Sequence, residues 1–191
     1  MARQKTKLIS SILRIAIDAM LAALYIALAY LTIEIGNIHI TAMTLAIIVC
    51  AMLYSPIDAA VVGLLGEFIM QLLGYGLTPT TILWILPPAI YGALLGVMMW
   101  ICRGFGRRPE KSPMFLVPAC FISALVLTGL NTLVQYLDAI IVGYSAAYIF
   151  VDLPTRILVG LGTAILLSVA SMPIVIALRR SGFGTPVRAK K

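Results

Sequence analysis

The stretch that decides the fold is GLLGEFIMQLLGYGLTPTTILWILPP, from Gly63 to Pro88. It reads as an apolar helix that carries a carboxylate, a loop of glycines and threonines, and the start of a second apolar helix. Glu67 lies one helical turn from both Gly63 and Gln71. Tyr75 lies two turns away, so all four share one helix face. A carboxylate in an apolar helix is costly unless it faces protein, water or a ligand. Glu67 is therefore either a structural hydrogen-bonding residue or, as we favour, part of a solute site.

The composition places the chain among integral membrane proteins of the helical type. Hydrophobic residues make up 62% of its 191 residues, charged residues make up 11%, and the mean hydropathy is +1.07. A hydrocarbon core about 30 Å thick needs about 20 apolar residues per helix, so the length allows about six spans. The apolar runs predict spans over residues 13–33, 42–54, 57–73, 82–101, 114–138 and 152–177. The second run is short, and we expect it to cross obliquely or only in part.

We therefore predict an all-α bundle of six transmembrane helices with both termini in the cytoplasm. This topology puts thirteen of the fourteen Lys and Arg residues on one side, which the positive-inside rule assigns to the cytoplasm. They form three groups: Arg3, Lys5, Lys7 and Arg14; Arg103, Arg107, Arg108 and Lys111; and Arg179, Arg180, Arg188, Lys190 and Lys191. The predicted organisation is a basic cytoplasmic tail (1–12), a transmembrane domain (13–178) and a second basic tail (179–191). Because the +7 charge flanks the spans in this way, it does not indicate a nucleic-acid partner.

Polar side chains gather near the outer ends of the predicted spans, away from the basic groups. Asn131, Gln135 and Asp138 follow one another at steps of four and three. These steps put them on one helix face, which favours a wet cavity over a purely structural role. The further candidates for this site are Glu67, Gln71, Trp84, Tyr91 and Arg156. The inner half of the bundle offers mainly Leu, Ile, Ala, Gly and Met, so we expect a pocket that opens outward.

Two of these candidates have an alternative role. Trp84 is either a member of the aromatic belt at the membrane interface or a stacking surface for a flat ligand. Asp152 is predicted to cap the last span, with Pro154 in its first turn. Arg156 then either pairs with Asp152, four residues earlier, or binds an anionic group together with the positive end of the helix.

Two polar connections lie on the outer side. The segment 34–41, EIGNIHIT, contains His39, the only histidine of the chain. We expect His39 to be a surface loop residue, with a lid contact to a ligand as the alternative. The loop 74–81, GYGLTPTT, is either an ordinary turn or a set of hydroxyl groups that bind a solute.

Small residues line one face of the first span. Ala16, Ala19, Ala23 and Ala27 recur at three- and four-residue steps and form a smooth surface on which another helix can pack closely. This alanine face either packs against a helix of the same chain or docks a separate membrane protein.

The motifs of several other activities are missing. The sequence has no P-loop, no HExxH and no GxSxG, and a single histidine argues against a metal site. The three cysteines lie in or beside apolar segments without metal-ligand spacing, which is typical of small buried hydrophobes. No convincing internal repeat indicates a complete alternating-access carrier. We expect no enzyme activity and no bound metal or covalent cofactor, and favour a capture subunit energised by a partner. The alternatives are a stand-alone solute carrier or channel and, third, a membrane-embedded enzyme.

The chain resembles a known family of membrane proteins. The Ala19-Ala23-Ala27 helix and GLLGEF, residues 63–68, are similar to features of the substrate-binding subunit, or S component, of energy-coupling factor (ECF) transporters. The resemblance covers most of the chain and includes the six spans and the basic N-terminus. The nearest pattern is the folate, pantothenate and riboflavin group, although Glu67 stands where an Asp is common in the folate type.

The resemblance implies high-affinity capture of a water-soluble vitamin or related micronutrient, with folate-like or pantothenate-like ligands favoured. It implies a multi-pass protein of a bacterial-type plasma membrane. It also implies a membrane-embedded coupling subunit, docked on the alanine face, and two cytoplasmic ATPase subunits. The outer loops and the outer ends of spans three to six would hold the ligand. The residues implied are Glu67, Gln71, Trp84, Tyr91, Asn131, Gln135, Arg156 and His39.

Overall fold

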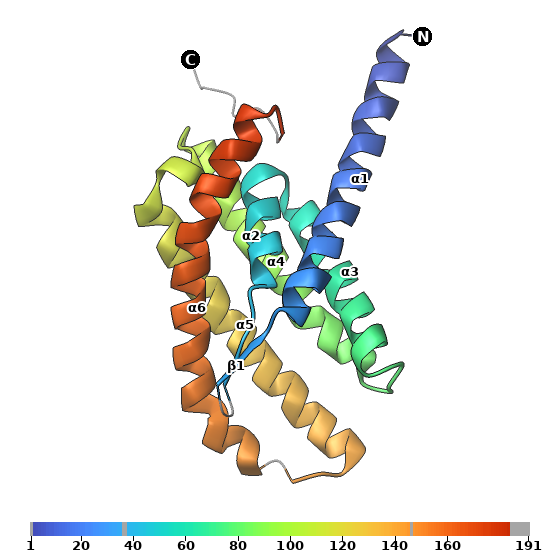
Figure 1. Cartoon of the computed structure of the whole chain (residues 1–191), viewed down its shortest axis with the longest axis vertical. Coiled ribbons are helices and arrows are strands. Elements are labelled where there is room, and N and C mark those ends of the chain that lie inside the picture. Colours follow the sequence, from blue (N-terminus) through green and yellow to red (C-terminus); the bar gives the residue numbers. More distant parts are fainter. Residues whose placement is uncertain (1, 36–37, 146, 184–191) are drawn as a thin grey trace.

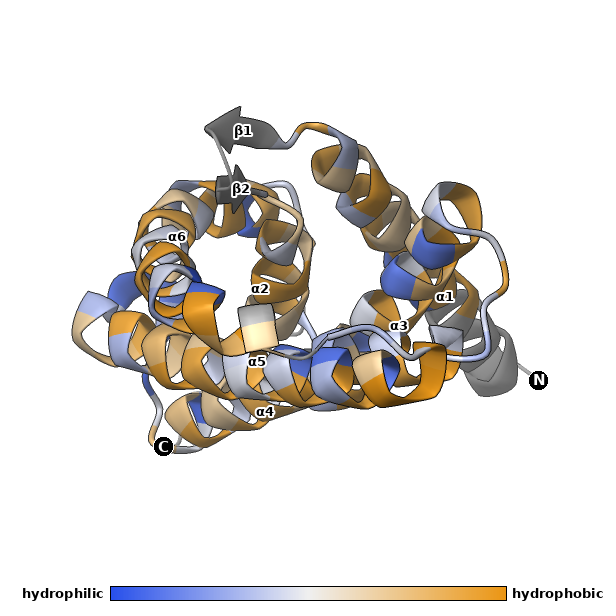
Figure 2. Cartoon of the chain, turned by 90° about the horizontal axis from the view of Figure 1, so that it is seen from below, coloured by the Kyte–Doolittle hydropathy of each residue, from blue (hydrophilic) through white to orange (hydrophobic). Residues whose placement is uncertain are grey.

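The computed structural model describes residues 2–35, 38–145 and 147–183. Within these residues the chain forms six α-helices, one hairpin and one short 3-10 helix (Figure 1). In chain order they are α1 (Ala2–Tyr30), β1 (Ile33–Ile35), β2 (Ile38–Ile40), α2 (Thr44–Leu53), α3 (Pro56–Gly74), α4 (Thr81–Gly104), η1 (Pro109–Lys111), α5 (Pro113–Val142) and α6 (Ala147–Arg180). Seen from the end where α5 joins α6, α1 and α6 lie on opposite sides of the bundle (Figure 2).

Among the residues that the structure describes, five helices are long and apolar enough to cross a membrane. They are α1 from Ile12 onward, α3, α4, α5 and α6. The sixth, α2, has ten residues, and at about 1.5 Å per residue it covers only about half of a 30 Å hydrocarbon core. Six helices are therefore present as predicted, and the second is too short to be a full span.

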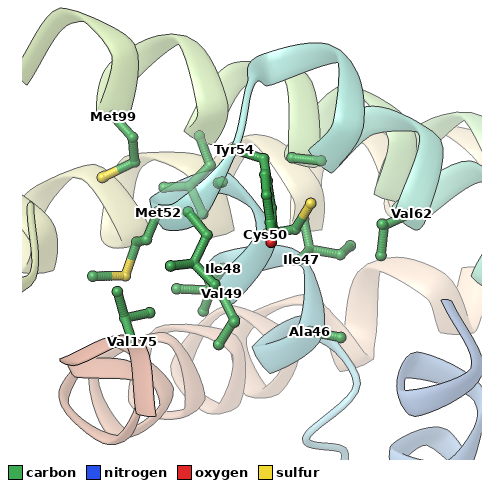
Figure 3. Packing of buried hydrophobic residues seen from close by; sticks show 14 of the residues in the cluster. Ala46, Ile47, Ile48, Val49, Cys50, Met52, Tyr54, Val62, Met99 and Val175 are labelled. Carbon is green, nitrogen blue, oxygen red and sulfur yellow. The ribbon is translucent and has the colours of Figure 1, made fainter. Parts of the chain in front are cut away.

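The short helix α2 forms the centre of the apolar core. All of its residues from Ala46 to Leu53 are buried, and α1, α3, α4 and α6 pack around it. Figure 3 shows side chains of α2 beside Val62 of α3, Met99 of α4 and Val175 of α6. A helix that is buried on every side can be apolar on every side, which explains why its sequence shows no polar face.

Two arginines bind the last carbonyl groups of α2. Arg103 of α4 donates a hydrogen bond from Nη2 to the oxygen of Ala51 at 3.0 Å, and Arg179 of α6 donates from Nη2 to the oxygen of Met52 at 2.9 Å. Arg179 also pairs with buried Glu110 of η1 at 3.0 Å. Cations are favourable at the negative C-terminal end of a helix, so these contacts stabilise α2 where it stops inside the bundle.

The basic ends of the helices lie at one end of the molecule. The N-terminal end of α1, the connection between α4 and α5, and the C-terminal end of α6 all lie toward the top of Figure 1. The contact between Glu110 and Arg179 joins two of these three segments directly. The connection between α5 and α6 lies at the opposite end.

Helices α3 and α4 touch through their backbones. A Cβ atom on Gly63 would lie 2.5 Å from the carbonyl oxygen of Pro88, and one on Gly92 would lie 2.3 Å from that of Ala59. No side chain fits at these distances, so glycine is required at both crossing points. Gly63, the first glycine of GLLGEF, therefore has a packing role: it brings α4 close to the helix that carries Glu67.

Near its middle, α1 is joined to α3 by a charged contact. Arg14 donates to both carboxylate oxygens of Asp58, with an Nε to Oδ1 distance of 2.9 Å, and to the Ser55 hydroxyl at 2.8 Å. Ser55 and Asp58 also form a capping box at the start of α3. The arginine thus joins α1 to the capped end of the next long helix.

The segment between the first two helices differs from the sequence prediction. Instead of an unstructured polar interruption, β1 and β2 form a short antiparallel pair in which Glu34 lies opposite His39. Isoleucines alternate with polar residues in both strands, and this period of two was the signal for a hairpin. The side chain of His39 lies outside the part of the chain that the structure describes.

The start of the last helix was also predicted wrongly. Helix α6 begins at Ala147, so Asp152 lies inside the helix and does not cap it. Pro154 lies inside the helix as well. A membrane helix tolerates an internal proline when neighbouring groups form hydrogen bonds with the backbone groups that the proline leaves unpaired. Arg156 is nine residues from the helix start, so the positive helix end cannot assist it in binding an anion.

Candidate functional site

A cavity of about 700 Å³ lies between α2, α4, α5 and α6. It is lined by the start of α2, the first turns of α4, the second half of α5 and the first half of α6. Its polar lining residues are Thr41, Thr44, Thr128, Asn131, Thr132, Gln135, Asp152, Thr155, Arg156 and Thr163, and its aromatic ones are Tyr75, Trp84 and Tyr91. Small-molecule sites have volumes of about 300 to 1,000 Å³, so a drug-sized solute fits.

The cavity belongs to the end of the bundle that carries the connection between α5 and α6. Figure 2 views the molecule from this end, and hydrophilic residues of α5 stand out there among apolar helices. The basic helix ends lie at the other end (Figure 1). The polar residues are therefore grouped at one end of the bundle, as the sequence predicted.

Arg156 and Gln135 connect the two long helices across the cavity. Arg156 of α6 donates a hydrogen bond from Nη1 to the side-chain oxygen of Gln135 on α5. Among the described residues, Arg156 has no ion pair with Asp152, so the predicted pairing within α6 is not formed. A guanidinium group has five N–H donors, and the bond to Gln135 uses one of them. The remaining donors are available to an anionic group in the cavity.

Threonine hydroxyls supply further acceptors. Thr128, Thr132 and Thr163 each donate to a carbonyl oxygen one turn earlier in their own helix, at 2.9, 2.8 and 2.7 Å. Because the single proton of each hydroxyl is used in this way, its oxygen is left with acceptor capacity for a solute in the cavity that these residues line. Asn131 adds an amide, which can both donate and accept.

A smaller compartment of about 160 Å³ adjoins the cavity and contains Glu67. Five residues line both spaces, namely Met43, Thr44, Trp84, Leu127 and Asn131. The other lining residues are Tyr25, Glu67, Gln71 and Pro88. Trp84 and Asn131 therefore lie at the boundary between a larger compartment that holds Arg156 and a smaller one that holds Glu67.

Glu67 is held in place by two neutral partners. The Tyr25 hydroxyl donates to Oε2 at 2.7 Å, and Gln71 donates from Nε2 to Oε1 at 2.9 Å. Gly66 makes the first bond possible, because a Cβ atom there would lie 2.6 Å from the Tyr25 ring. The structural alternative for Glu67 is thus present as hydrogen bonds, while its carboxylate also lines a cavity.

Sequence reasoning missed Tyr25. It lies in an apolar run and is completely buried on α1. Two signals could have identified it. A buried tyrosine hydroxyl needs a hydrogen-bond partner. In addition, Tyr25 lies two residues from both Ala23 and Ala27, which places it about 200° around the helix from each of them. It therefore points away from the alanine face and toward α3.

Some predicted site residues lie elsewhere. Asp138 does not line either space, and its carboxylate accepts a hydrogen bond from the Tyr144 hydroxyl at 2.8 Å. The prediction of three polar residues in one wet cavity is therefore wrong for Asp138. In the loop after α3, the Thr81 hydroxyl accepts from the backbone of Thr78 at 2.9 Å, and neither residue lines a cavity. These hydroxyls stabilise an ordinary turn.

The alanine face of α1 is exposed. Ala16, Ala19, Ala23 and Ala27 are all exposed, whereas Ala22 and Ala29 on the other side of the helix are buried. The alanine face is therefore not used for packing inside this chain, which was one of the two alternatives.

The fold and the site define a class: a multi-pass helical membrane protein with a solute-sized polar cavity at one end. Residues 13–176 match the sequence profile of the family described as "ECF transporter, substrate-specific component". This match covers most of the chain, and the protein belongs to that family. Comparisons with curated proteins and with solved structures give no significant match.

Family membership fixes the general role of the molecule. S components are subunits of a transporter rather than enzymes, and they work with a membrane T component and ATPase subunits. The protein is therefore a substrate-binding subunit in the plasma membrane, which it crosses several times.

Proposed function

We propose that this S component captures a water-soluble vitamin or related micronutrient from the outer side of the membrane, with folate-like or pantothenate-like ligands favoured. The observation that carries the proposal is the cavity of about 700 Å³ with Arg156 on its wall. Among the described residues that line the cavity, the charged ones are Arg156 and Asp152, and amides, hydroxyls and aromatic rings make up much of the rest. The guanidinium suits an acidic group of a solute, and the other groups suit a polar body.

The orientation rests on charge. The basic helix ends lie together at one end of the molecule, and the positive-inside rule assigns that end to the cytoplasm. Both termini then face the cytoplasm, with the basic tails 1–12 and 179–191 on that side. The cavity lies at the opposite end, so it would open toward the outside.

The residues that would hold the ligand have different tasks. Arg156 would bind a carboxylate or phosphate through the donors that Gln135 leaves free. Gln135 and Asn131 would bind amide-like edges, and Trp84 and Tyr91 would provide flat apolar walls. Gln71 would act by holding Glu67. His39, in β2, would reach the ligand only if the hairpin covers the cavity.

The partners follow from the exposed alanine face. Ala19, Ala23 and Ala27 present small side chains without a helix of this chain over them, so a helix of the T component could approach closely. Two cytoplasmic ATPase subunits would then drive the assembled transporter.

The test combines ligand identification with matched variants. Small molecules that co-purify with the detergent-solubilised chain are identified by mass spectrometry and titrated calorimetrically into the unmodified chain and the Arg156→Ala variant. Hydrogen bonds to a charged group contribute about 1.5–3 kcal/mol, so we expect Arg156→Ala to weaken binding about tenfold or more. Arg180→Ala, at the other end of the same helix, is the control and should bind normally.

Two results would overturn the proposal. One is the failure of any vitamin-sized anion to bind the purified chain. The other is robust uptake of solute without ATP by liposomes that contain only this chain, which would indicate a stand-alone carrier or channel.

A further inference from the structure

The Glu67 carboxylate has unused capacity to accept hydrogen bonds. A carboxylate offers about four acceptor positions. Tyr25 and Gln71 occupy two of them, one on each oxygen. The residue is only 8% exposed, so bulk water reaches it poorly. About half of its acceptor capacity is therefore unused, and Glu67 lines the smaller compartment.

The part of the chain that the structure describes places no cation beside this carboxylate. None of the nine residues that line the smaller compartment is Lys, Arg or His. The partners of Glu67 are a hydroxyl and an amide, and the described residues form no ion pair with it. A buried carboxylate in this situation is stabilised by any group that brings N–H donors to it. A ligand that displaces water from this compartment must replace the hydrogen bonds of that water.

The volume and the lining of the compartment suit the ring of a ligand. Its volume is about 160 Å³, and a cavity of about 150 Å³ is known to take one benzene ring. Trp84, Pro88, Leu127 and Met43 give it largely apolar walls, so the polar atoms of a ligand would have to meet Glu67, Gln71 or Asn131. A flat ring that is apolar on its faces and donates from one edge meets both demands.

We propose that the smaller compartment binds the head group of the transported solute, and that this head group is a planar nitrogen heterocycle with adjacent N–H donors on one edge. The donor edge meets the free acceptor positions of Glu67, and the six-membered ring that carries this edge lies beside Trp84. A second, fused ring would extend toward the larger compartment. The rest of the ligand passes Asn131 into the larger compartment, where its acidic group meets Arg156. This inference rests on the proposed function and narrows it: the ligand has a donor-rich ring at one end and an anion at the other.

The proposal separates the two favoured kinds of ligand. A folate-like molecule has an amino-substituted ring with such an edge and carboxylates at the far end. A pantothenate-like molecule has no ring and no donor edge, so it gains nothing from Glu67. Asp152 also lines the larger compartment, and its formal charge balances that of Arg156, so the head group supplies a contact that net charge in that compartment does not.

The test uses two probes that differ at the donor edge. Pterin-6-carboxylate has a ring N–H next to an amino group, whereas lumazine-6-carboxylate has an oxo group in place of that amino group. Each is titrated into the unmodified chain and into Glu67→Gln. In the unmodified chain the pterin should bind about tenfold or more tightly, because the oxo group removes one charge-assisted bond and points an acceptor at a carboxylate.

The Glu67→Gln variant shows whether Glu67 binds the donor edge of the ligand or only holds neighbouring side chains in place. Glu67→Gln preserves size but replaces one acceptor oxygen with a donor, so the preference for the pterin should fall toward onefold. If Glu67 only held Tyr25 and Gln71, both probes would weaken together and the ratio of their affinities would stay the same. Asp138→Asn, a matched carboxylate-to-amide change outside both compartments, should leave both affinities unchanged.

Several results would overturn the inference. They are equal binding of the two probes to the unmodified chain, an unchanged ratio in Glu67→Gln, or no binding of either probe. Pantothenate is titrated in parallel to locate the failure. If pantothenate binds tightly and depends on Arg156 while the pterin preference is missing, the head-group inference fails and the proposed function stands. If no anion binds, both fail.

Discussion

At the scale of single residues, the site depends on Tyr25, a completely buried tyrosine whose hydroxyl binds Glu67. Tyr25 lies against the bare backbone of Gly66 and reaches the carboxylate of the next residue, Glu67. This arrangement orients a polar group in an apolar bundle without adding a second charge. The carboxylate keeps its free acceptor positions because its partners on the protein are neutral.

Removing this hydroxyl tests its contribution to stability. Tyr25→Phe keeps the ring that packs on Gly66 but removes a buried bond to a carboxylate, so we expect a loss of about 1.5–3 kcal/mol in the free energy of unfolding. Thermal or denaturant unfolding of the purified chain measures it. Tyr30→Phe on the exposed part of the same helix is the control and should change stability by less than about 0.5 kcal/mol. Equal effects of the two substitutions would contradict the assigned role of the bond.

Residue patterns in the sequence were sufficient to predict some of the residues that line the candidate site, but not others. Asn131, Gln135 and Arg156 were found because polar residues in apolar helices are rare and costly. Asp138 followed the same pattern, but its partner, Tyr144, comes from the connection after α5, and one helix's periodicity contains no information about that loop. Tyr25 was missed because its role depends on contact with another helix, which a single apolar run does not reveal.

At the scale of the elements, α3 is the helix against which both neighbours are aligned. Its glycines receive the backbone of α4 and the ring of Tyr25, and it binds α1 through Asp58 in its first turn and Glu67 in its interior. The two faces of α1 consequently have different roles: the buried face is fastened to α3, and the alanine face remains outside.

The close contact of α3 and α4 leads to a prediction about glycine. Gly92→Ala would place a Cβ atom 2.3 Å from the backbone oxygen of Ala59, so the helices must separate and the folded protein should be strongly destabilised. Gly129→Ala, in the middle of α5, meets nothing within 4 Å and should be neutral or stabilise by up to about 1 kcal/mol through helix propensity. Fluorescence-detected size exclusion after heating compares the two. Equal melting behaviour would show that the crossing is looser than the structure indicates.

Hydropathy was sufficient to predict the number of helices but not where each helix begins. Five long apolar helices and one short one followed from the apolar runs, because lipid requires such lengths. The start of α6 did not, because Asp152 and Pro154 resemble a helix start but lie within a continuous helix. The local sequence around a proline can be the same whether the proline lies inside a membrane helix or in its first turn. The packing of the surrounding helices determines which of the two positions it occupies.

At the scale of the whole molecule, the cavity and the alanine face are separate surfaces. The cavity lies between α2, α4, α5 and α6, and the alanine face lies on α1, which is on the opposite side of the bundle from α6. Ligand capture and assembly with the T component should therefore be separable by mutation.

The corresponding prediction is a loss of assembly without a loss of binding. The double substitution Ala19→Leu and Ala23→Leu fills the smooth face and should abolish co-purification with the T component and ATPase subunits. The ligand affinity should change by less than about twofold, since neither residue lines a cavity. Ala170→Leu, on the exposed side of α6, is the matched control and should leave assembly intact. Normal assembly of the double variant would show that the T component docks elsewhere.

The buried helix α2 has a consequence for the cell that carries this protein. Its dry apolar side chains lie among α1, α3, α4 and α6, and guanidinium groups close its end toward the basic side. An ion would have to leave water and cross this packed interior to pass from the cavity to that side, which is costly in a medium of low polarity. An idle copy of the subunit should therefore be electrically silent. A cell can keep many copies waiting for scarce nutrient without dissipating its proton and sodium gradients.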